Sequence, residues 1–267
     1  MVLALFDYKK YQKYNTLNIS KILVSQPVPS DPKSPYFEFA KNANVEILFR
    51  PFIHVEGIDA KEFRKQRIDL LAFTAVVFTS KVAIDHYFRL AEELRVSIPD
   101  TMKYFCMSEE VAVYLQKYIV YRKRKIFFSS VGKRVQDMVE VMKKHKDEKF
   151  LLPLSVVHKN DVPDALTEGG FTFSKAFLYQ TVSSDLTDIN INDYQVLVFF
   201  SPQGIASLKS NFPNFVQGET AIGCLGPATA KAIEEAGLRL DFSAPSPECP
   251  SILVALSKYV SSVNSAE

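Results

Sequence analysis

Two stretches of the chain share one change of pattern, from a short apolar run to an apolar stripe with helical spacing. Residues 77–80 and 198–201 end runs rich in β-branched and aromatic side chains, and both runs stop at a serine. A short run of this kind predicts a buried strand. Beyond the first serine, apolar residues recur every three or four positions: Ile84, Tyr87, Phe88, Ala91 and Leu94. Each stretch therefore predicts a strand followed by an amphipathic helix.

Two more strand-helix units follow each of these stretches. Residues 103–107 and 220–225 predict the second strands, and residues 126–128 and 240–242 predict the third strands. A helical pattern follows each of them. Three matched units in the same order indicate an internal duplication.

Two strand-helix-strand pieces remain outside the triplets, at residues 22–49 and 150–178. In the first piece, Ser34 and Pro35 are expected to cap and open the helix. One piece precedes its triplet, whereas the other follows its own. If each domain needs one such piece, the first piece joins the last triplet and the middle of the chain is an inserted domain.

The alternation of strands and helices favours parallel sheets, because a parallel crossover needs a dozen or more residues. The sequence therefore predicts an α/β fold, with two similar parallel-sheet domains, one inserted in the other, joined by a two-stranded linker around a central cleft. Ligands of such sheets bind beyond the carboxyl ends of the strands. The expected bounds are residues 1–20 for an N-terminal extension with the composition of a Tyr- and Lys-rich helix, 21–49 and 183–267 for a discontinuous domain 1, 50–56 and 179–182 for the linker crossings, and 57–178 for the inserted domain 2.

The composition of the chain argues against several classes of protein. The 32 basic and 30 acidic residues nearly cancel, so the strong field of a dedicated nucleic-acid binder is missing. Three widely spaced cysteines suggest neither a disulfide framework nor a zinc site and point to a reducing cytoplasm. The longest apolar run, residues 70–78, is too short to span a bilayer. We expect a cytoplasmic protein with no membrane partner, and a monomer, since no exposed apolar stripe stands out.

Candidate cofactor and metal sites are scarce as well. The four histidines are too scattered for a metal spacing and are expected to lie singly on surfaces or domain edges. Nine glycines and a Gly223–Gly226 stretch without dinucleotide-loop spacing argue against a bound dinucleotide. Residues 117–134 carry seven Lys and Arg and no acid. This run could draw in an anionic substrate, but a solvated surface is the favoured interpretation.

The order of the strand ends resembles that of the uroporphyrinogen-III synthase family from about Lys21 to Val260. The resemblance lies in residues 77–80, 178–182, 198–202, 221–230, 236–238 and 244–247. It implies a lyase that cyclises hydroxymethylbilane, a linear tetrapyrrole polycarboxylate, with inversion of the terminal D pyrrole ring and loss of water, in heme biosynthesis. It also implies two domains with a two-stranded linker, no cofactor and no metal. The sequence departs from the family pattern at Gln26, Ser108, Val111, Lys159, Asn160 and Ala228.

Strand ends and helix starts supply the candidate site. Free N–H groups and the dipole at a helix N-terminus attract carboxylates. The candidate substrate-binding residues are Thr79, Ser80, Ser108, Ser201, Pro202, Gly226 and Thr229. The alternative is that each hydroxyl merely caps its helix. The half that carries Ser201 and Thr229 keeps the family pattern better, so domain 1 is expected to hold more of the substrate.

Tyr179 is the candidate catalytic residue, because it lies in residues 178–182, which resemble the family, and because it stands at the second crossing. Its hydroxyl could assist loss of the substrate hydroxyl as a weak general acid. Alternatively, it is a linker tyrosine that packs one face and presents its polar tip to water. The rival function is a non-catalytic two-domain protein of this fold that binds or senses a small ligand.

Overall fold

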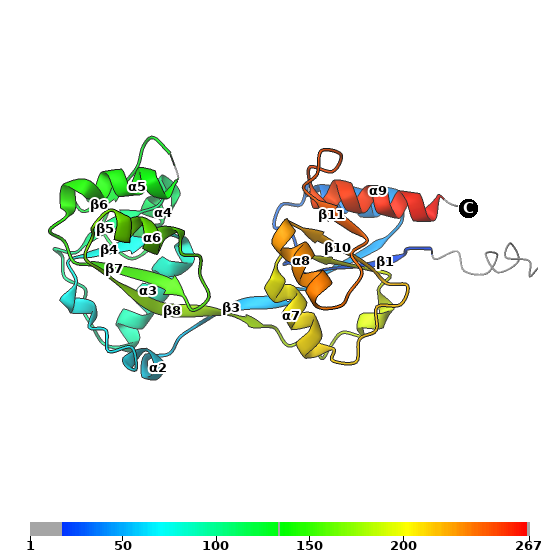
Figure 1. The fold of residues 1–267 in the computed structure, drawn as a ribbon, viewed down its shortest axis with the longest axis horizontal. Helices are drawn as coiled ribbons and strands as arrows, with labels where there is room; N and C mark the ends of the chain where they lie inside the picture. Colours follow the sequence, from blue (N-terminus) through cyan, green and yellow to red (C-terminus); the bar gives the residue numbers. More distant parts are fainter. Residues whose placement is uncertain (1–17, 133, 266–267) are drawn as a thin grey trace, which may run out of the picture. The chain divides into compact units, whose positions relative to one another are not determined.

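The computed structural model describes residues 18–132 and 134–265, so most of the expected N-terminal extension lies outside the described residues. The chain forms two compact units, unit 1 from Met1–His54 and Val182–Glu267, and unit 2 from Val55–Thr181 (Figure 1). It passes from unit 1 into unit 2 once and returns once. The finer bounds of two independently folding domains stay a prediction.

Unit 1 is built on a sheet with the strand order β11-β10-β9-β1-β2, in which all neighbours are parallel. Its elements are β1 (Lys21–Val24), α1 (Pro35–Ala43), β2 (Glu46–Phe49), η4 (Ile191–Asp193), β9 (Val196–Phe199), α7 (Pro202–Asn211), β10 (Ala221–Leu225), α8 (Pro227–Glu235), β11 (Phe242–Ala244) and α9 (Ile252–Asn264). Ile22 and Val24 pack into the core with α9, whereas Leu23, between them, packs into the core with α7 and α8. Helices thus cover both sheet faces, which is why β1 is apolar without interruption.

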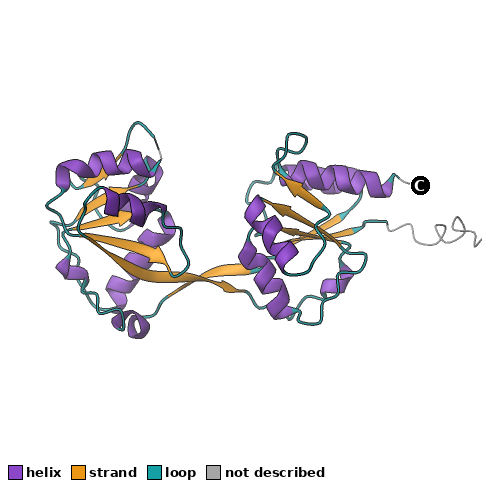
Figure 2. Cartoon of the chain, in the orientation of Figure 1, coloured by secondary structure: helices purple, strands orange, loops and turns teal. Residues whose placement is uncertain are grey.

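Unit 2 has the strand order β3-β8-β7-β4-β5-β6, and its five strands from β8 to β6 are parallel. Its strands are β3 (Ile53–Gly57), β4 (Ala75–Phe78), β5 (Lys103–Cys106), β6 (Ile126–Phe128), β7 (Phe150–Ser155) and β8 (Phe173–Ser183). Its helices are α2 (Ala60–Arg64), η1 (Leu70–Ala72), α3 (Lys81–Glu93), α4 (Glu109–Tyr114), η2 (Leu115–Lys117), α5 (Val135–Met142), η3 (Lys143–His145) and α6 (Asp161–Glu168). One core packs against α3 and α4, and the other against α5 and α6. Figure 2 shows the helices, in purple, around the strands of the sheet, in orange.

The two sheets repeat one topology. In unit 2 the strands β4, β5 and β6 follow one another across the sheet, and β7 and β8 lie on the other side of β4. In unit 1 the strands β9, β10 and β11 do the same, with β1 and β2 on the other side of β9. Ile22 and Val196 are register partners, so the first strand lies in the sheet of the last triplet. The predicted α/β class with two parallel sheets is confirmed.

The strands β3 and β8 carry the chain between the units. The Ile58 N–H donates to the Leu178 carbonyl at 2.8 Å, and the Ser184 N–H donates to the Phe52 carbonyl at 2.9 Å. Ile58 thus pairs with Leu178, and the earlier residue Phe52 pairs with the later residue Ser184. The two crossing strands therefore run in opposite directions.

Several local expectations need correction. The last strand was expected at residues 240–242 but lies at Phe242–Ala244, because Leu240 packs against the core beside the sheet and Asp241 bonds to Ile222 before the strand begins. Ser34 stands at the N-cap of α1 and Pro35 opens the helix, but the Ser34 side chain makes no capping bond. Within the described residues, no helix is long and apolar enough to cross a membrane.

Candidate active site

The carboxyl ends of three neighbouring strands in unit 2 carry hydroxyl side chains. Thr79 and Ser80 follow β4, Ser108 follows β5, and Ser155 ends β7. The first two are half-buried and Ser108 is 8% exposed. Parallel strands end at one sheet edge, so these residues occupy the edge where ligands of such sheets bind.

The hydroxyls of Ser80 and Ser108 each cap a helix. Ser80 Oγ accepts a hydrogen bond from the Ala83 N–H at 3.1 Å at the start of α3. Ser108 Oγ accepts one from the Val111 N–H at 3.4 Å at the start of α4. A capping hydroxyl keeps its own proton and a second lone pair, so capping and ligand binding can coexist. The binding role of these serines stays a prediction.

Tyr179 lies on β8 and faces α3 of the same unit. Its ring stacks on the imidazole of His86, with 5.1 Å between the ring centroids and 18° between the planes. Burial raises the pKa of Tyr179, and the nearby Ser80 side chain offsets part of this rise. The Tyr179 hydroxyl therefore stays protonated at neutral pH. The structure thus brings together Tyr179 and Ser80, two residues that sequence reasoning had named separately.

His86 and Arg89 complete this cluster, and sequence reasoning missed both. The histidines are expected to lie singly on surfaces or domain edges; His86 is half-buried and stacks on Tyr179 of β8, so it does not stand alone. Arg89 Nε donates to His86 Nδ1 at 3.2 Å. Burial, and then the charge of Arg89, lowers the pKa of His86. Their spacing on one helix was visible in the sequence, but the contact with Tyr179 joins distant segments.

Ser155 is a further residue that the sequence did not single out. It is the register partner of Tyr179, and the Val156 N–H that follows it donates to the Tyr179 carbonyl at 2.9 Å. The Ser155 Oγ is buried, and among the described residues it has no hydrogen-bond partner. A buried hydroxyl without a partner costs free energy unless a water molecule bonds to it.

Unit 1 offers the corresponding set at the ends of β9 and β10. Ser201 Oγ accepts from the Gly204 N–H at 3.3 Å and caps α7, which Pro202 opens. Gly226 stands before α8 with a φ of +88°, a conformation that favours glycine. Thr229 lies in the first turn of α8 and is 2% exposed. The Thr229 hydroxyl is thus enclosed, which makes it the member of the predicted set with least access to a ligand.

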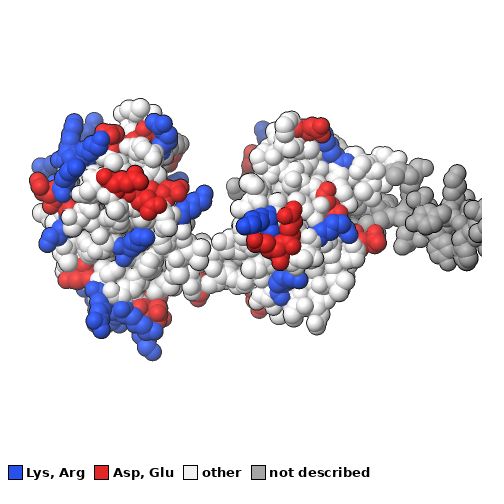
Figure 3. All heavy atoms as spheres, in the orientation of Figure 1, with Lys and Arg blue, Asp and Glu red and all other residues white. Residues whose placement is uncertain are grey.

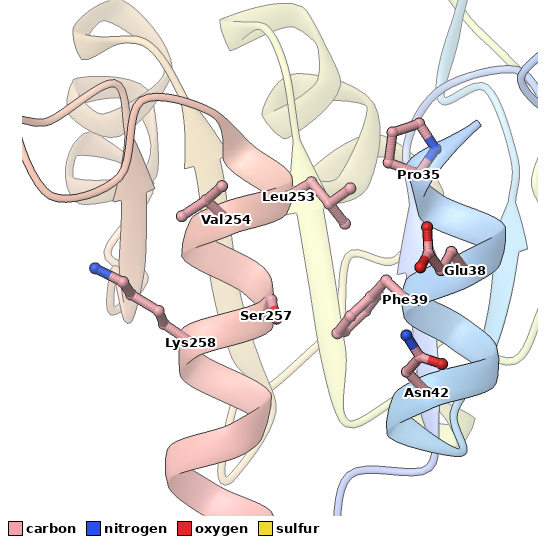
Figure 4. A pocket seen from close by; sticks show the side chains of 8 residues that line it. All are labelled: Pro35, Glu38, Phe39, Asn42, Leu253, Val254, Ser257 and Lys258. Atoms are coloured by element: carbon pink, nitrogen blue, oxygen red, sulfur yellow. The ribbon is translucent and has the colours of Figure 1, made fainter. Parts of the chain in front are cut away.

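A separate groove in unit 1 lies between α1 and α9 (Figure 4). Its volume is about 370 Å³. Its lining consists of Pro35, Glu38, Phe39, Asn42, Leu253, Val254, Ser257 and Lys258. None of the predicted site residues lines it, so this groove is distinct from the strand-end site.

Figure 3 shows basic and acidic side chains side by side on one face of each unit. The basic stretch before β6 has exposed side chains at Arg122, Lys123 and Arg124, as the surface interpretation expects. Within residues 18–132 and 134–265, no group of three or more His, Cys, Asp or Glu side chains could hold a metal ion.

Comparison with known proteins gives the family. The profile described as "Uroporphyrinogen-III synthase HemD" matches residues 37–253, which is most of the chain. The chain belongs to the uroporphyrinogen-III synthase family. It is therefore a cyclising lyase of tetrapyrrole biosynthesis that acts on a small tetrapyrrole. The resemblance read from the strand ends is confirmed.

One solved structure of the family shares the fold, and others are similar to this chain at lower scores. The uroporphyrinogen-III synthetase of Helicobacter pylori is 19% identical, covers 91% of this chain and 99% of its own, and has a TM-score of 0.54. A mutant uroporphyrinogen III synthase of Thermus thermophilus is 12% identical, covers 93% of this chain and 100% of its own, and has a TM-score of 0.48. Among curated proteins, no sequence matches the chain.

Proposed function

We propose that the enzyme cyclises hydroxymethylbilane with inversion of the terminal D ring, and that the strand-end residues of both units carry this reaction. The observation that supports the proposal most is the cluster of Tyr179, Ser80 and His86 at one sheet edge of unit 2. It places a protonated phenol among hydroxyls at the edge where parallel α/β sheets bind ligands. The central cleft expected from the sequence stays part of this proposal.

Tyr179 acts at the first bond to break. Its O–H transfers its proton to the hydroxyl oxygen of the substrate as the carbon–oxygen bond breaks, so that the hydroxyl leaves as water. The phenolate regains a proton from the substrate when the D ring becomes aromatic again after closure. The raised pKa of Tyr179 keeps the proton on its oxygen until that moment. General acids in the best geometry contribute a rate factor of about 10² or more, but a phenol is a weak acid, so its contribution here is expected to be several-fold.

The remaining catalysis is positioning of a flexible polycarboxylate. The two ends of the linear tetrapyrrole must meet in the arrangement that inverts the D ring before uninverted closure occurs. An enzyme that holds the substrate in a fixed geometry removes much of the entropic cost of bringing these ends together. The helices α3, α7 and α8 begin at Ser80, Ser201 and Gly226, and their free N–H groups and dipoles attract carboxylates. Thr79, Ser108, Pro202 and Thr229 complete the proposed contacts. We further propose that unit 1 holds more of the substrate.

The proposed setting is a monomer in a reducing cytoplasm. All three cysteines are free, and two of them are buried. Their burial supports a compartment in which disulfides do not form. Neither the reaction nor the proposed contacts require a cofactor or a metal.

The test couples the purified protein to an enzyme that generates hydroxymethylbilane, oxidises the products and separates the porphyrin isomers. Isomer III above the uncatalysed background is the expected result. Formation of isomer I alone, at the uncatalysed rate, would refute the synthase and favour the non-catalytic ligand-binding alternative.

Tyr179→Phe tests the catalytic assignment in the same assay. The rate of isomer III formation should fall several-fold, while the fold stays intact. Tyr259→Phe is the matched control, because Tyr259 stacks on Phe242 in unit 1, away from the proposed contacts. An unchanged rate for Tyr179→Phe would remove Tyr179 from the mechanism.

A further inference from the structure

Arg89 ties helix α3 to both crossing strands beside Tyr179. Its Nη2 donates to the Ile58 carbonyl at 2.7 Å and to the Leu178 carbonyl at 3.4 Å. Its Nη1 pairs with Glu93 on the next turn of α3. Leu178 directly precedes Tyr179, so the guanidinium holds the backbone from which the Tyr179 ring projects.

The same guanidinium determines the state of the His86 ring. Arg89 carries its charge at all ordinary pH values and can only donate hydrogen bonds. His86 Nδ1, 3.2 Å from Arg89 Nε, must therefore be the acceptor, and the proton of the neutral imidazole lies on Nε2. Arg89 thus holds one edge of the imidazole, while its face is stacked on Tyr179.

The strand β3 leaves space for this arrangement at Gly57. A Cβ added to Gly57 would lie 2.7 Å from the Arg89 Cζ, closer than real contacts allow. A side chain at this position would displace the guanidinium from the carbonyls and from His86. Three features therefore concern the same part of β8: Gly57 leaves room for Arg89, Arg89 bonds to the Leu178 carbonyl, and His86 stacks on Tyr179.

We propose that His86 is a positioning residue for Tyr179: its imidazole, held at Nδ1 by Arg89, is the surface on which the Tyr179 ring stacks. This inference rests on the proposed role of Tyr179 in the synthase reaction. A phenol ring without such a stacking partner samples more orientations, and a reacting group displaced by about 1 Å can lose about 10²-fold in rate. His86 touches no substrate in this scheme and acts only through Tyr179.

The kinetic test is a double-mutant cycle. His86→Ala should lower kcat about three- to tenfold, the range that corresponds to a stacked aromatic pair, with a much smaller change in KM. His86→Phe keeps a flat ring for stacking and should retain kcat within about twofold of the parent. In a Tyr179→Phe background, His86→Ala should change kcat by less than about twofold, because the hydroxyl to be positioned is gone.

A residue that merely stabilised unit 2 would give the same factor in both backgrounds, and this result would overturn the proposal. So would an unchanged kcat in His86→Ala, or a His86→Phe variant as impaired as His86→Ala. An unchanged kcat in Tyr179→Phe alone would equally remove the proposed route of action.

A second measurement does not depend on turnover. In protein labelled with ¹³C-tyrosine, the Tyr179 signal is identified by its loss in Tyr179→Phe. His86→Ala should remove the ring-current shift of that signal and bring the pKa of Tyr179 down, because the phenol gains water. His86→Phe should keep the ring-current shift.

His145→Ala is the matched control for this measurement, since His145 packs on Phe127 in the same unit. It should leave the Tyr179 signal in place. If the parent protein forms only isomer I, the proposed function fails, and the Tyr179 signal alone decides whether His86 positions the ring. A Tyr179 signal that does not respond to His86→Ala would refute the positioning role.

Discussion

Ser80 joins two roles in one hydroxyl, and a single substitution should separate them. Ser80→Ala removes the capping bond to the Ala83 N–H and the polar group that lowers the pKa of Tyr179. Loss of an N-cap hydroxyl costs about 1 kcal/mol of stability. With a denaturant dependence of about 2 kcal/mol per molar urea, the unfolding midpoint of unit 2 should fall by about 0.5 M.

The rate effect follows from the interaction of Ser80 with Tyr179. A polar interaction of this kind is worth about 1 kcal/mol, which corresponds to about a fivefold decrease in kcat if Tyr179 loses its orientation. The pKa of Tyr179 should also rise further, because the Ser80 contact lowers it at present. Both changes make the phenol a poorer donor to the leaving hydroxyl.

Ser251→Ala provides the matched comparison, because Ser251 caps α9 through the Val254 N–H at 3.3 Å. Urea unfolding and the coupled isomer assay should show a similar loss of stability for both variants, but a loss of rate only for Ser80→Ala. If both variants keep the parent rate, Ser80 is only a cap. If both lose rate equally, the loss reflects general destabilisation, and the reasoning about Tyr179 is wrong.

Core packing, acid stability and thiol reactivity give further tests. Gly223→Ala places a Cβ 2.0 Å from the Phe242 ring and should lower the free energy of unfolding by about 1–3 kcal/mol in urea; an unchanged midpoint would contradict the close packing. Burial and the charge of Arg89 lower the pKa of His86 in the folded protein below its ordinary 6.5. The neutral imidazole therefore contributes stability above pH 6.5, and this stability is lost as the pH falls through the pKa that His86 has in the folded protein. The difference in unfolding midpoint between parent and His86→Phe should therefore change on the acid side of pH 6.5 and be flat above it; a pH-independent difference would contradict this. In thiol titration Cys249 should react first, because burial raises the pKa of the other two thiols to about 11 and about 12; equal rates for all three would show that the units open readily.

The fold was largely predictable because the central strands of both units, such as β4 and β9, are buried on two faces. Each such strand is a short apolar run, and each run is followed by a helical stripe, so the repeat was visible without a structure. The strand bounds at residues 126–128 agree with β6. The short helix α2 was not predicted, because five residues carry too little periodicity.

The site was only partly predictable. Ser80 and Tyr179 were named from local pattern and family resemblance, and their interaction in unit 2 was not foreseen. His86 was misjudged, since its surroundings come from β8, far along the chain. Spacing along one helix shows which residues share a face, but not which distant strand packs against it.

The position of β1 between β2 and β9 has a consequence for synthesis on the ribosome. Ile22 cannot meet its partner Val196 until the intervening chain, which includes all of unit 2, has been made. Unit 2 is contiguous and can complete its sheet during elongation, whereas β1 and β2 must wait with apolar faces uncovered. Nascent chains should therefore become protease-resistant in the middle segment first, while the earliest residues made are among the last to be protected.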